Sequence, residues 1–238
     1  MFSSSGGWSA TIIYPTSGNV LLDHLLGATI HHYPDGEDEA GADRQLESIA
    51  AELRNDGHRP YVIHLAPGHA PLGALGYVVA AEELVQQAQS KALVFDEVVV
   101  ASGSGHTHAG LLFGLRWLAC PAVVTGVCVR RDATQQRERI LTRTHEIAEL
   151  LKVDNPVTAD DIVLTDAFLA PGYGRVSDGT RDAISLAARH ESLLVDPVYT
   201  GKVMAATLKR ATETDATIVF VHTGGTPALF AYQQELAE

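Results

Sequence analysis

One stretch near the middle of the chain limits the possible fold more than any other. Val98–Ala101 is an apolar run, residues 102–107 are rich in Ser and Gly, and residues 111–115 are apolar again. This order predicts a buried strand, a tight turn and the start of a helix. Glycines let the backbone approach an anion, and the unpaired N–H groups of a first helical turn attract negative charge. The stretch therefore predicts a phosphate-binding loop, although an ordinary Gly-rich turn has the same local pattern.

The composition is that of a globular protein, with 46% hydrophobic and 19% charged residues among 238. A formal net charge of −12 argues against nucleic-acid and membrane-surface partners, because both require basic patches. No run of 18 apolar residues is present, and the first residues do not resemble a signal peptide. Cys120 and Cys128 lie in apolar surroundings, so we expect buried thiols in a cytoplasmic protein.

Strand-like and helix-like segments alternate along the chain. Apolar and β-branched runs predict strands at residues 10–14, 28–32, 61–65, 98–101, 123–130, 162–164, 193–195 and 217–222. Helical spacing predicts helices at residues 20–26, 41–56, 74–89, 134–152, 178–190 and 202–212, and one that follows the Gly-rich turn. Asp132 and Gln135 have the spacing of a helix-capping box. The alternation predicts a three-layer α/β fold, with a parallel sheet covered by helices on both faces.

Ligands of open parallel sheets bind beyond the carboxyl ends of the strands, and three such ends are unusual here. The first is the Ser102–Thr107 loop, and the second is Asp196–Lys202, where Tyr199 is expected at the rim. The third is His222–Pro227, where two glycines leave space for a flat ligand beside Thr223. A phosphate site, an aromatic ring and a hydroxyl together suggest a phosphorylated aromatic cofactor, pyridoxal 5′-phosphate.

Four ordered motifs carry a resemblance to a known family. They are Ser102–Gly110, the Ala-Pro-Gly-Tyr-Gly segment at 170–174, Asp196–Lys202 and residues 222–232. Together they resemble the D-cysteine desulfhydrase branch of the pyridoxal-phosphate family, which also contains 1-aminocyclopropane-1-carboxylate (ACC) deaminase and L-cysteate sulfo-lyase. The resemblance implies a tryptophan-synthase-β-like fold (fold type II) that is truncated at the N-terminus. It also implies a remnant of the small domain at residues 1–57 and a large cofactor-binding domain at residues 58–238.

The same resemblance implies roles for individual residues. The cofactor phosphate would be bound by Ser102, Gly103, Ser104, Gly105, His106 and Thr107. Tyr199 would stack near the pyridine ring, Tyr173 would line the substrate side, and both are the catalytic candidates. Thr223, beside Gly224, would hydrogen-bond the ring nitrogen, and an uncharged partner there suits β-elimination of a good leaving group.

The implied activity is α,β-elimination from D-cysteine to pyruvate, ammonia and hydrogen sulfide. ACC deaminase and L-cysteate sulfo-lyase activities stay open as alternatives. Relatives specialised for cyclopropane opening have Glu and Leu where this chain has Thr200 and Thr223, which favours the sulfur-eliminating branch. The expected partners are a small amino-acid substrate and either a second copy in a homodimer or a complementing N-terminal piece.

The chain departs from the family pattern in its lysines. The family's Schiff-base lysine lies in a Gly-Gly-Asn-Lys-type segment, and this sequence contains no such segment. Its four lysines are Lys91, Lys152, Lys202 and Lys209. Only Lys202 falls within a matching motif, and the resemblance implies that the lysine of this motif is not the catalytic one. We therefore expect weakened cofactor affinity and turnover near zero for this chain alone.

Three alternatives of other classes compete with this interpretation. Gly103-Ser104-Gly105 and Arg130-Arg131 imitate a nicotinamide dinucleotide site, but the third position of that fingerprint falls on His108. The 11 histidines suggest a metal enzyme, yet no pair has ligand spacing, so we expect no metal. A protein that binds the cofactor without turnover is the third alternative.

Overall fold

The computed structural model of the protein describes residues 2–4, 17–34 and 38–237. The chain forms two compact units, Met1–His69 and Ala70–Glu238. Each unit is described by itself below. The strand expected at residues 10–14 lies outside the described residues, and the domain boundary expected after residue 57 stays a prediction. Among the described residues, no helix has both the length and the apolar character needed to cross a bilayer.

The first unit pairs two short parallel strands and carries two helices. Its elements are β1 (Phe2–Ser4), α1 (Asn19–Leu25), β2 (His31–Tyr33) and α2 (Glu39–Asn55). The helices expected at residues 20–26 and 41–56 are thus present, whereas β1 was not predicted. At the start of α2 the Asp38 carboxylate accepts a hydrogen bond from Gly41 N at 2.8 Å, and this bond lowers the pKa of that carboxyl group.

The strand expected at residues 61–65 is absent, so that prediction was wrong. The physical reason lies in Asp43, a residue of α2 that is only 4% exposed. Its carboxylate accepts hydrogen bonds from the amides of Leu65, at 3.2 Å, and Ala66, at 2.9 Å. The alternating apolar residues of this segment indicated a strand, but the amide of its last residue, Leu65, and that of the next residue, Ala66, bind a side chain instead of a neighbouring strand.

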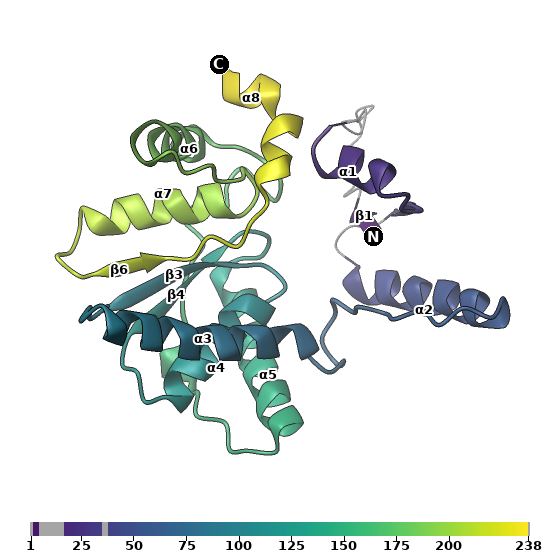
Figure 1. The fold of residues 1–238 in the computed structure, drawn as a ribbon, viewed down its shortest axis with the longest axis horizontal. Helices are drawn as coiled ribbons and strands as arrows, with labels where there is room; N and C mark the ends of the chain where they lie inside the picture. The colour runs from purple at the N-terminus through teal and green to yellow at the C-terminus, as the bar shows by residue number, and fades with distance from the viewer. Residues whose placement is uncertain (1, 5–16, 35–37, 238) are drawn as a thin grey trace. The chain divides into compact units, whose positions relative to one another are not determined.

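The second unit holds a four-stranded parallel sheet in the order β5-β4-β3-β6 (Figure 1). Its strands are β3 (Glu97–Ser102), β4 (Val123–Cys128), β5 (Val163–Thr165) and β6 (Ile218–Phe220). Its α-helices are α3 (Leu72–Ser90), α4 (His106–Trp117), α5 (Ala133–Leu151), α6 (Asp178–Glu191), α7 (Thr200–Ala211) and α8 (Gln233–Ala237). Two 3₁₀ turns, Ala159–Asp161 and Thr226–Ala231, complete the unit.

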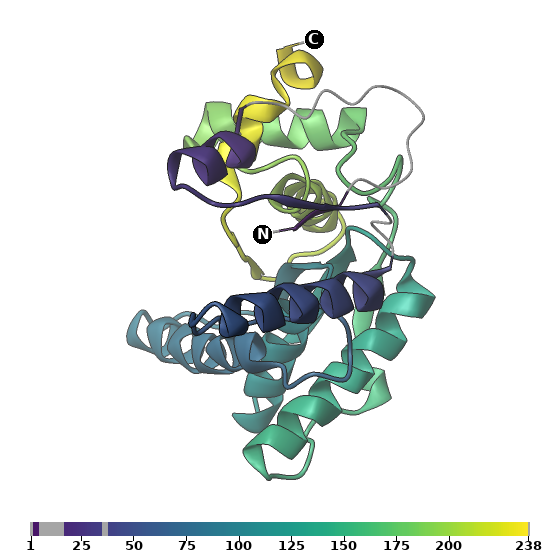
Figure 2. The same cartoon turned by 90° about the vertical axis from the view of Figure 1, so that its right-hand side faces the viewer.

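Successive residues of β3 point into different helical layers. Val98 and Val100 are fully buried in a cluster with α3, α4 and α5. Val99 and Ala101 point to the opposite face, where they pack with Val203 of α7. Figures 1 and 2 show α3 and α7 on opposite sides of the sheet. The predicted three-layer α/β fold with a parallel sheet is confirmed.

Most of the helices expected in this unit are present, but the strand expected at residues 193–195 is not. Leu193 N donates to Ala187 O at 3.2 Å, so this amide completes the end of α6 rather than a sheet ladder. Val195 is nonetheless fully buried among residues of α6 and α7. The apolar run was therefore correctly expected in the core, but in the wrong conformation. The predicted cap of α5 is observed, because Asp132 accepts from Gln135 N at 2.8 Å.

Candidate functional site

The Gly-rich turn joins the end of β3 to the start of α4. Gly105 is the N-cap residue of α4 and has a left-handed backbone conformation, with φ 92° and ψ −13°. A Cβ atom there would also come within 3.2 Å of Ile140 Cδ1, so the position favours glycine twice over. No side chain caps this helix end. The first turn of α4, which contains His106 and the half-buried Thr107, can therefore offer its amide groups to an anion.

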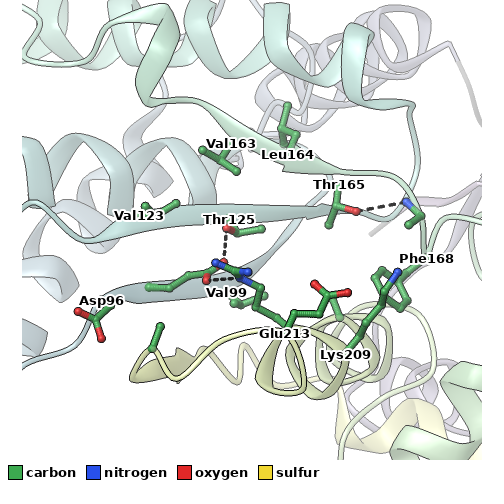
Figure 3. A pocket seen from close by; sticks show the side chains of 15 residues that line it. Asp96, Val99, Val123, Thr125, Val163, Leu164, Thr165, Phe168, Lys209 and Glu213 are labelled. Carbon is green, nitrogen blue, oxygen red and sulfur yellow. Dashed lines mark hydrogen bonds and ion pairs between the residues drawn. The ribbon is translucent and has the colours of Figure 1, made fainter.

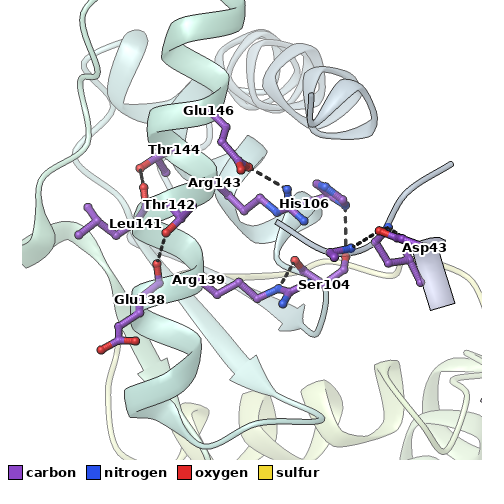
Figure 4. A network of polar contacts seen from close by, with 12 residues as sticks. Asp43, Ser104, His106, Glu138, Arg139, Leu141, Thr142, Arg143, Thr144 and Glu146 are labelled. Carbon is purple, nitrogen blue, oxygen red and sulfur yellow. Dashed lines mark hydrogen bonds and ion pairs between the residues drawn. The ribbon is translucent and has the colours of Figure 1, made fainter. Parts of the chain in front are cut away.

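Side chains of α5 and of the loop before it hold the turn from below. Arg139 Nε donates to Ser104 O at 2.8 Å (Figure 4). Gln136 Nε2 donates to Gly103 O at 3.1 Å, and Arg131 also donates to this carbonyl oxygen, at 3.3 Å. The carbonyl groups of Gly103 and Ser104 thus have fixed directions before any ligand binds.

A chain of buried polar groups lies beneath this turn. Ser102 is fully buried; its Oγ accepts from Gln136 Nε2 at 2.9 Å and lies 3.0 Å from Nδ1 of His108. His108 is also fully buried and occupies space that a side chain at Gly126 would fill, since a Cβ there would come within 2.3 Å of His108 Nδ1. Burial lowers the pKa of His108 to about 4, so the imidazole is neutral. Ser102 Oγ is thus held between Gln136 and His108, and it supports the turn from inside.

Asp196 fixes the second loop and the start of α7. Its carboxylate is 1% exposed and accepts hydrogen bonds from the amides of Val198, Tyr199 and Thr200, each at 2.8 Å. The Thr200 hydroxyl donates to the same carboxylate at 2.7 Å. A Cβ at Gly103 would lie 3.8 Å from a ring carbon of Tyr199. The Asp196 carboxylate thereby holds the Tyr199 ring next to the Gly-rich turn.

Tyr173 and Tyr199 form a pair at this site. Their hydroxyl groups are hydrogen-bonded to each other, and their rings meet edge to face with centroids 6.0 Å apart. The Arg130 guanidinium lies 5.6 Å from the centroid of the Tyr173 ring. Desolvation raises the pKa of the Tyr199 phenol, and the neighbouring Tyr173 and Asp196 raise it further. Tyr199 is therefore a neutral hydroxyl at physiological pH.

Lys202 holds the segment that carries Tyr173. Its side chain is fully buried, and Nζ donates to Leu169 O and to Gly172 O, both at 2.8 Å. Burial lowers the pKa of Lys202 to about 8. The amine is thus engaged by backbone carbonyl groups, which fits a structural role. The other three lysines, Lys91, Lys152 and Lys209, are exposed.

The third loop follows β6 and is more open. Thr223 is exposed, and the backbone of Gly224 and Gly225 has φ values of 96° and 89°. A Cβ at Gly225 would come within 2.8 Å of Asp196 Cγ, so this loop passes directly beside Asp196. Gly224 N donates to His222 Nδ1 at 3.1 Å. The structure therefore brings the first loop next to Tyr199 and the third next to Asp196.

These surroundings suit a flat phosphorylated ligand. An uncapped helix end with a left-handed glycine can hold a phosphate, and a tyrosine ring beside Gly103 can cover a flat ring. Sequence reasoning missed the supporting residues Asp196, Gln136 and Arg139. Only Asp196 left a signal, because an Asp directly before a Pro is typical of a turn in which its carboxylate accepts from amides two and three residues on.

A profile of the family described as pyridoxal-phosphate dependent enzymes matches residues 5–224. The chain belongs to this family. It is 41% identical over 223 residues to the D-cysteine desulfhydrase of Salmonella typhi, covering 92% of this chain and 66% of that protein. It is 40% identical over 227 residues to the D-cysteine desulfhydrase of Klebsiella pneumoniae, covering 94% and 67%. This chain thus spans about two thirds of the length of these relatives.

Solved structures agree with this family membership. An ACC deaminase homologue superposes with a TM-score of 0.82 at 34% identity, covering 99% of this chain and 68% of its own. An O-ureido-L-serine synthase, at 13% identity and a TM-score of 0.62, shares the fold alone. The predicted family and its fold type are confirmed, and pyridoxal phosphate is the cofactor of the family. The roles of individual site residues stay predictions.

Proposed function

We propose that this protein takes part in the pyridoxal-phosphate-dependent elimination of hydrogen sulfide from D-cysteine, which also gives pyruvate and ammonia. The observation that carries the proposal is the glycine turn at the uncapped start of α4, with the Tyr199 ring beside Gly103. The identity to D-cysteine desulfhydrases supports the choice of substrate. A small amino-acid substrate fits a family whose members act on amino acids.

Residues of the turn would bind the cofactor phosphate through backbone amides and hydroxyl groups. Ser104 and Thr107 would donate from the surface of the loop, together with the amides of Gly105 and His106. Ser102 would act from beneath, because its hydroxyl is buried against His108 and Gln136. The carbonyl groups of Gly103 and Ser104 are already engaged by Gln136 and Arg139, which keeps the turn in one conformation.

Tyr199, Tyr173 and Thr223 would orient the ring and handle protons on the substrate side. When bound, pyridoxal phosphate withdraws electrons from the substrate Cα and so makes its proton acidic. Thr223 would offer an uncharged hydroxyl to the ring nitrogen. The two tyrosine hydroxyls share a hydrogen bond, and Tyr199 is neutral. This pair could therefore donate a proton to the sulfur that leaves the substrate.

The lysines limit what this chain does by itself. Family chemistry needs an amine that bonds the cofactor and carries the Cα proton, and the Lys202 amine is held by two carbonyl oxygens. We therefore expect the 238-residue product to bind pyridoxal phosphate non-covalently and to turn over D-cysteine at a rate near zero. A cofactor-binding protein without turnover is the second candidate function, and the same observation favours it.

Absorbance and borohydride reduction test both statements. The purified chain should shift the spectrum of added pyridoxal phosphate, whereas reduction with borohydride should leave the protein mass unchanged. Tyr199→Phe should weaken binding severalfold, and Tyr61→Phe, at a position 75% exposed in the other unit, should not. A mass increase on reduction, or sulfide release from D-cysteine, would overturn the expected lack of turnover. Failure to bind the cofactor would overturn the site itself.

The substrate choice needs its own comparison. Adding D-cysteine to the cofactor complex should change its spectrum more than adding L-cysteine, ACC or L-cysteate. A larger change with ACC or L-cysteate would favour the corresponding alternative activity. We also propose that the protein is cytoplasmic and assembles as a homodimer or with a complementing polypeptide. Sedimentation of the purified chain can measure its oligomeric state.

A further inference from the structure

The two faces of the sheet in the second unit are covered unequally. On the side of α3, α4 and α5, Val98, Val100 and Val124 are fully buried. On the opposite side α7 covers Val99 and Val127, but Val123 is 40% and Val163 is 37% exposed. Parallel sheets normally carry helices on both faces, because both faces are apolar. The amino-terminal half of β4 and all of β5 thus lack this cover among the described residues.

A cavity of about 430 Å³ marks this uncovered area (Figure 3). Val123, Thr125 and Val163 form its floor, and Phe168 lies at one end. Lys209, near the end of α7, and Glu213, just after it, supply charges at its side. The floor is mostly apolar and the side is charged, which is the pattern that an amphipathic element complements.

The buried carboxylate that lines this cavity is already satisfied. Glu97 is 5% exposed, and its carboxylate accepts from Arg210 Nε at 2.8 Å and from the Thr125 hydroxyl at 2.6 Å. A small ion would have to compete with these bonds. The cavity therefore favours an apolar occupant over a metal ion or a small anion.

The direction of α7 shows how a neighbouring helix would run. Tyr199, at its start, lies beside Gly103 at the carboxyl end of β3, whereas Arg210, near its end, bonds Glu97 at the amino end. This helix therefore runs antiparallel to the strands, as helices of α/β sheets do. A second helix laid beside α7 in the same direction would bring its first turn to the edge that carries the Gly-rich turn.

We propose that this face is a docking surface for an amphipathic helix from the part of the relatives that has no counterpart in this chain. The ACC deaminase homologue superposes on 99% of this chain, yet the match covers only 68% of that homologue. About a third of its length therefore has no counterpart in this chain. The docking helix would place apolar side chains on Val123, Val163 and Phe168 and would pair charges with Lys209 and Glu213. This inference rests on the family fold and is independent of the proposed reaction.

A binding experiment without cofactor or substrate tests the surface. The probe is a polypeptide made of the part of the Salmonella typhi desulfhydrase outside the 223 matched residues, co-expressed with this chain. We expect a one-to-one complex, and Val163→Asp should weaken it at least tenfold. The matched control is Val79→Asp, since Val79 is 54% exposed on α3 in the layer on the other side of the sheet. This control should bind within twofold of the parent.

A second variant tests the surface in case Val163→Asp, which lies in a strand, fails to fold. Lys209→Glu, at an exposed helical position, should weaken the complex about threefold while leaving the thermal unfolding midpoint unchanged. Absence of a complex would overturn the proposal, and so would equal binding by Val163→Asp. Self-association of the chain that Val163→Asp abolishes and the probe does not displace would overturn it as well, because a second copy would then be the occupant.

Discussion

The loop after β3 and the loop after β6 look alike in the sequence but are built differently. Both follow strands that pair with each other, and both contain glycines with positive φ. Beneath the first loop lie buried side chains, and α5 binds its carbonyl groups. The loop after β6 leaves Thr223 exposed and has Asp196 beside it. We infer that the loop after β3 is preorganised for a phosphate, whereas the loop after β6 can adjust to the ligand.

The largest expected effect comes from the residue beside the loop after β6. Asp196→Ala removes the acceptor of three amides and a hydroxyl, of which the two groups of Thr200 are buried and the other two are partly buried. Leaving such donors unpaired costs roughly 1–3 kcal/mol each, so we expect the free energy of unfolding to fall by at least about 3 kcal/mol. Urea denaturation measures this change. Asp182→Ala, at an exposed position on α6, should change stability by less than about 0.5 kcal/mol.

The support beneath the first loop should show in the pH dependence of stability. The pKa of His108 is about 4 in the folded protein and 6.5 when exposed, so the unfolded state binds the proton first as the pH falls. The neutral imidazole therefore contributes fully above pH 6.5, and this contribution is lost between pH 6.5 and about 4. A shift of this size corresponds to roughly 3 kcal/mol.

His108→Gln should flatten this part of the stability curve, measured by urea denaturation at several pH values. The matched variant His190→Gln replaces an exposed histidine of α6 and should leave the slope as it is. An unchanged slope in His108→Gln would show that burial beneath the turn does not keep this imidazole neutral, and the first loop would then lose its distinction from the loop after β6.

Paired glycine substitutions compare the two loops directly. Gly105 and Gly224 have similar φ values of 92° and 96°, so alanine costs a similar 1–2 kcal/mol at each through the left-handed backbone. Only at Gly105 does the new Cβ meet a neighbour, at 3.2 Å from Ile140; at Gly224 nothing lies within 4 Å. We expect Gly105→Ala to be the more destabilising by about 1 kcal/mol. Equal losses would mean that α5 does not confine the first loop.

The sequence was sufficient to predict the layers and the three loops, because both depend on local patterns. Helices such as α3 and α5 followed from apolar spacing, and the sheet order places the loops after β3 and β6 on neighbouring strands. The supports of the site could not be found this way, since Gln136 meets Ser102 from 34 positions away. The missing strands at residues 61–65 and 193–195 have the same cause, because the amides of Leu65 and Leu193 bind groups outside these segments, the Asp43 carboxylate and the end of α6.

Thr223→Val should produce the smallest change and the most selective one. The side chain is exposed, so the free energy of unfolding should stay within about 0.5 kcal/mol of the parent value. Losing the hydrogen bond proposed between Thr223 and the ring nitrogen should weaken binding of pyridoxal phosphate by roughly threefold to tenfold, while inorganic phosphate competes as before. A fluorescence titration measures both affinities. If Thr223→Val weakened phosphate competition as well, the two loops would not bind separate parts of one ligand, and the loop after β6 could not be the adjustable one.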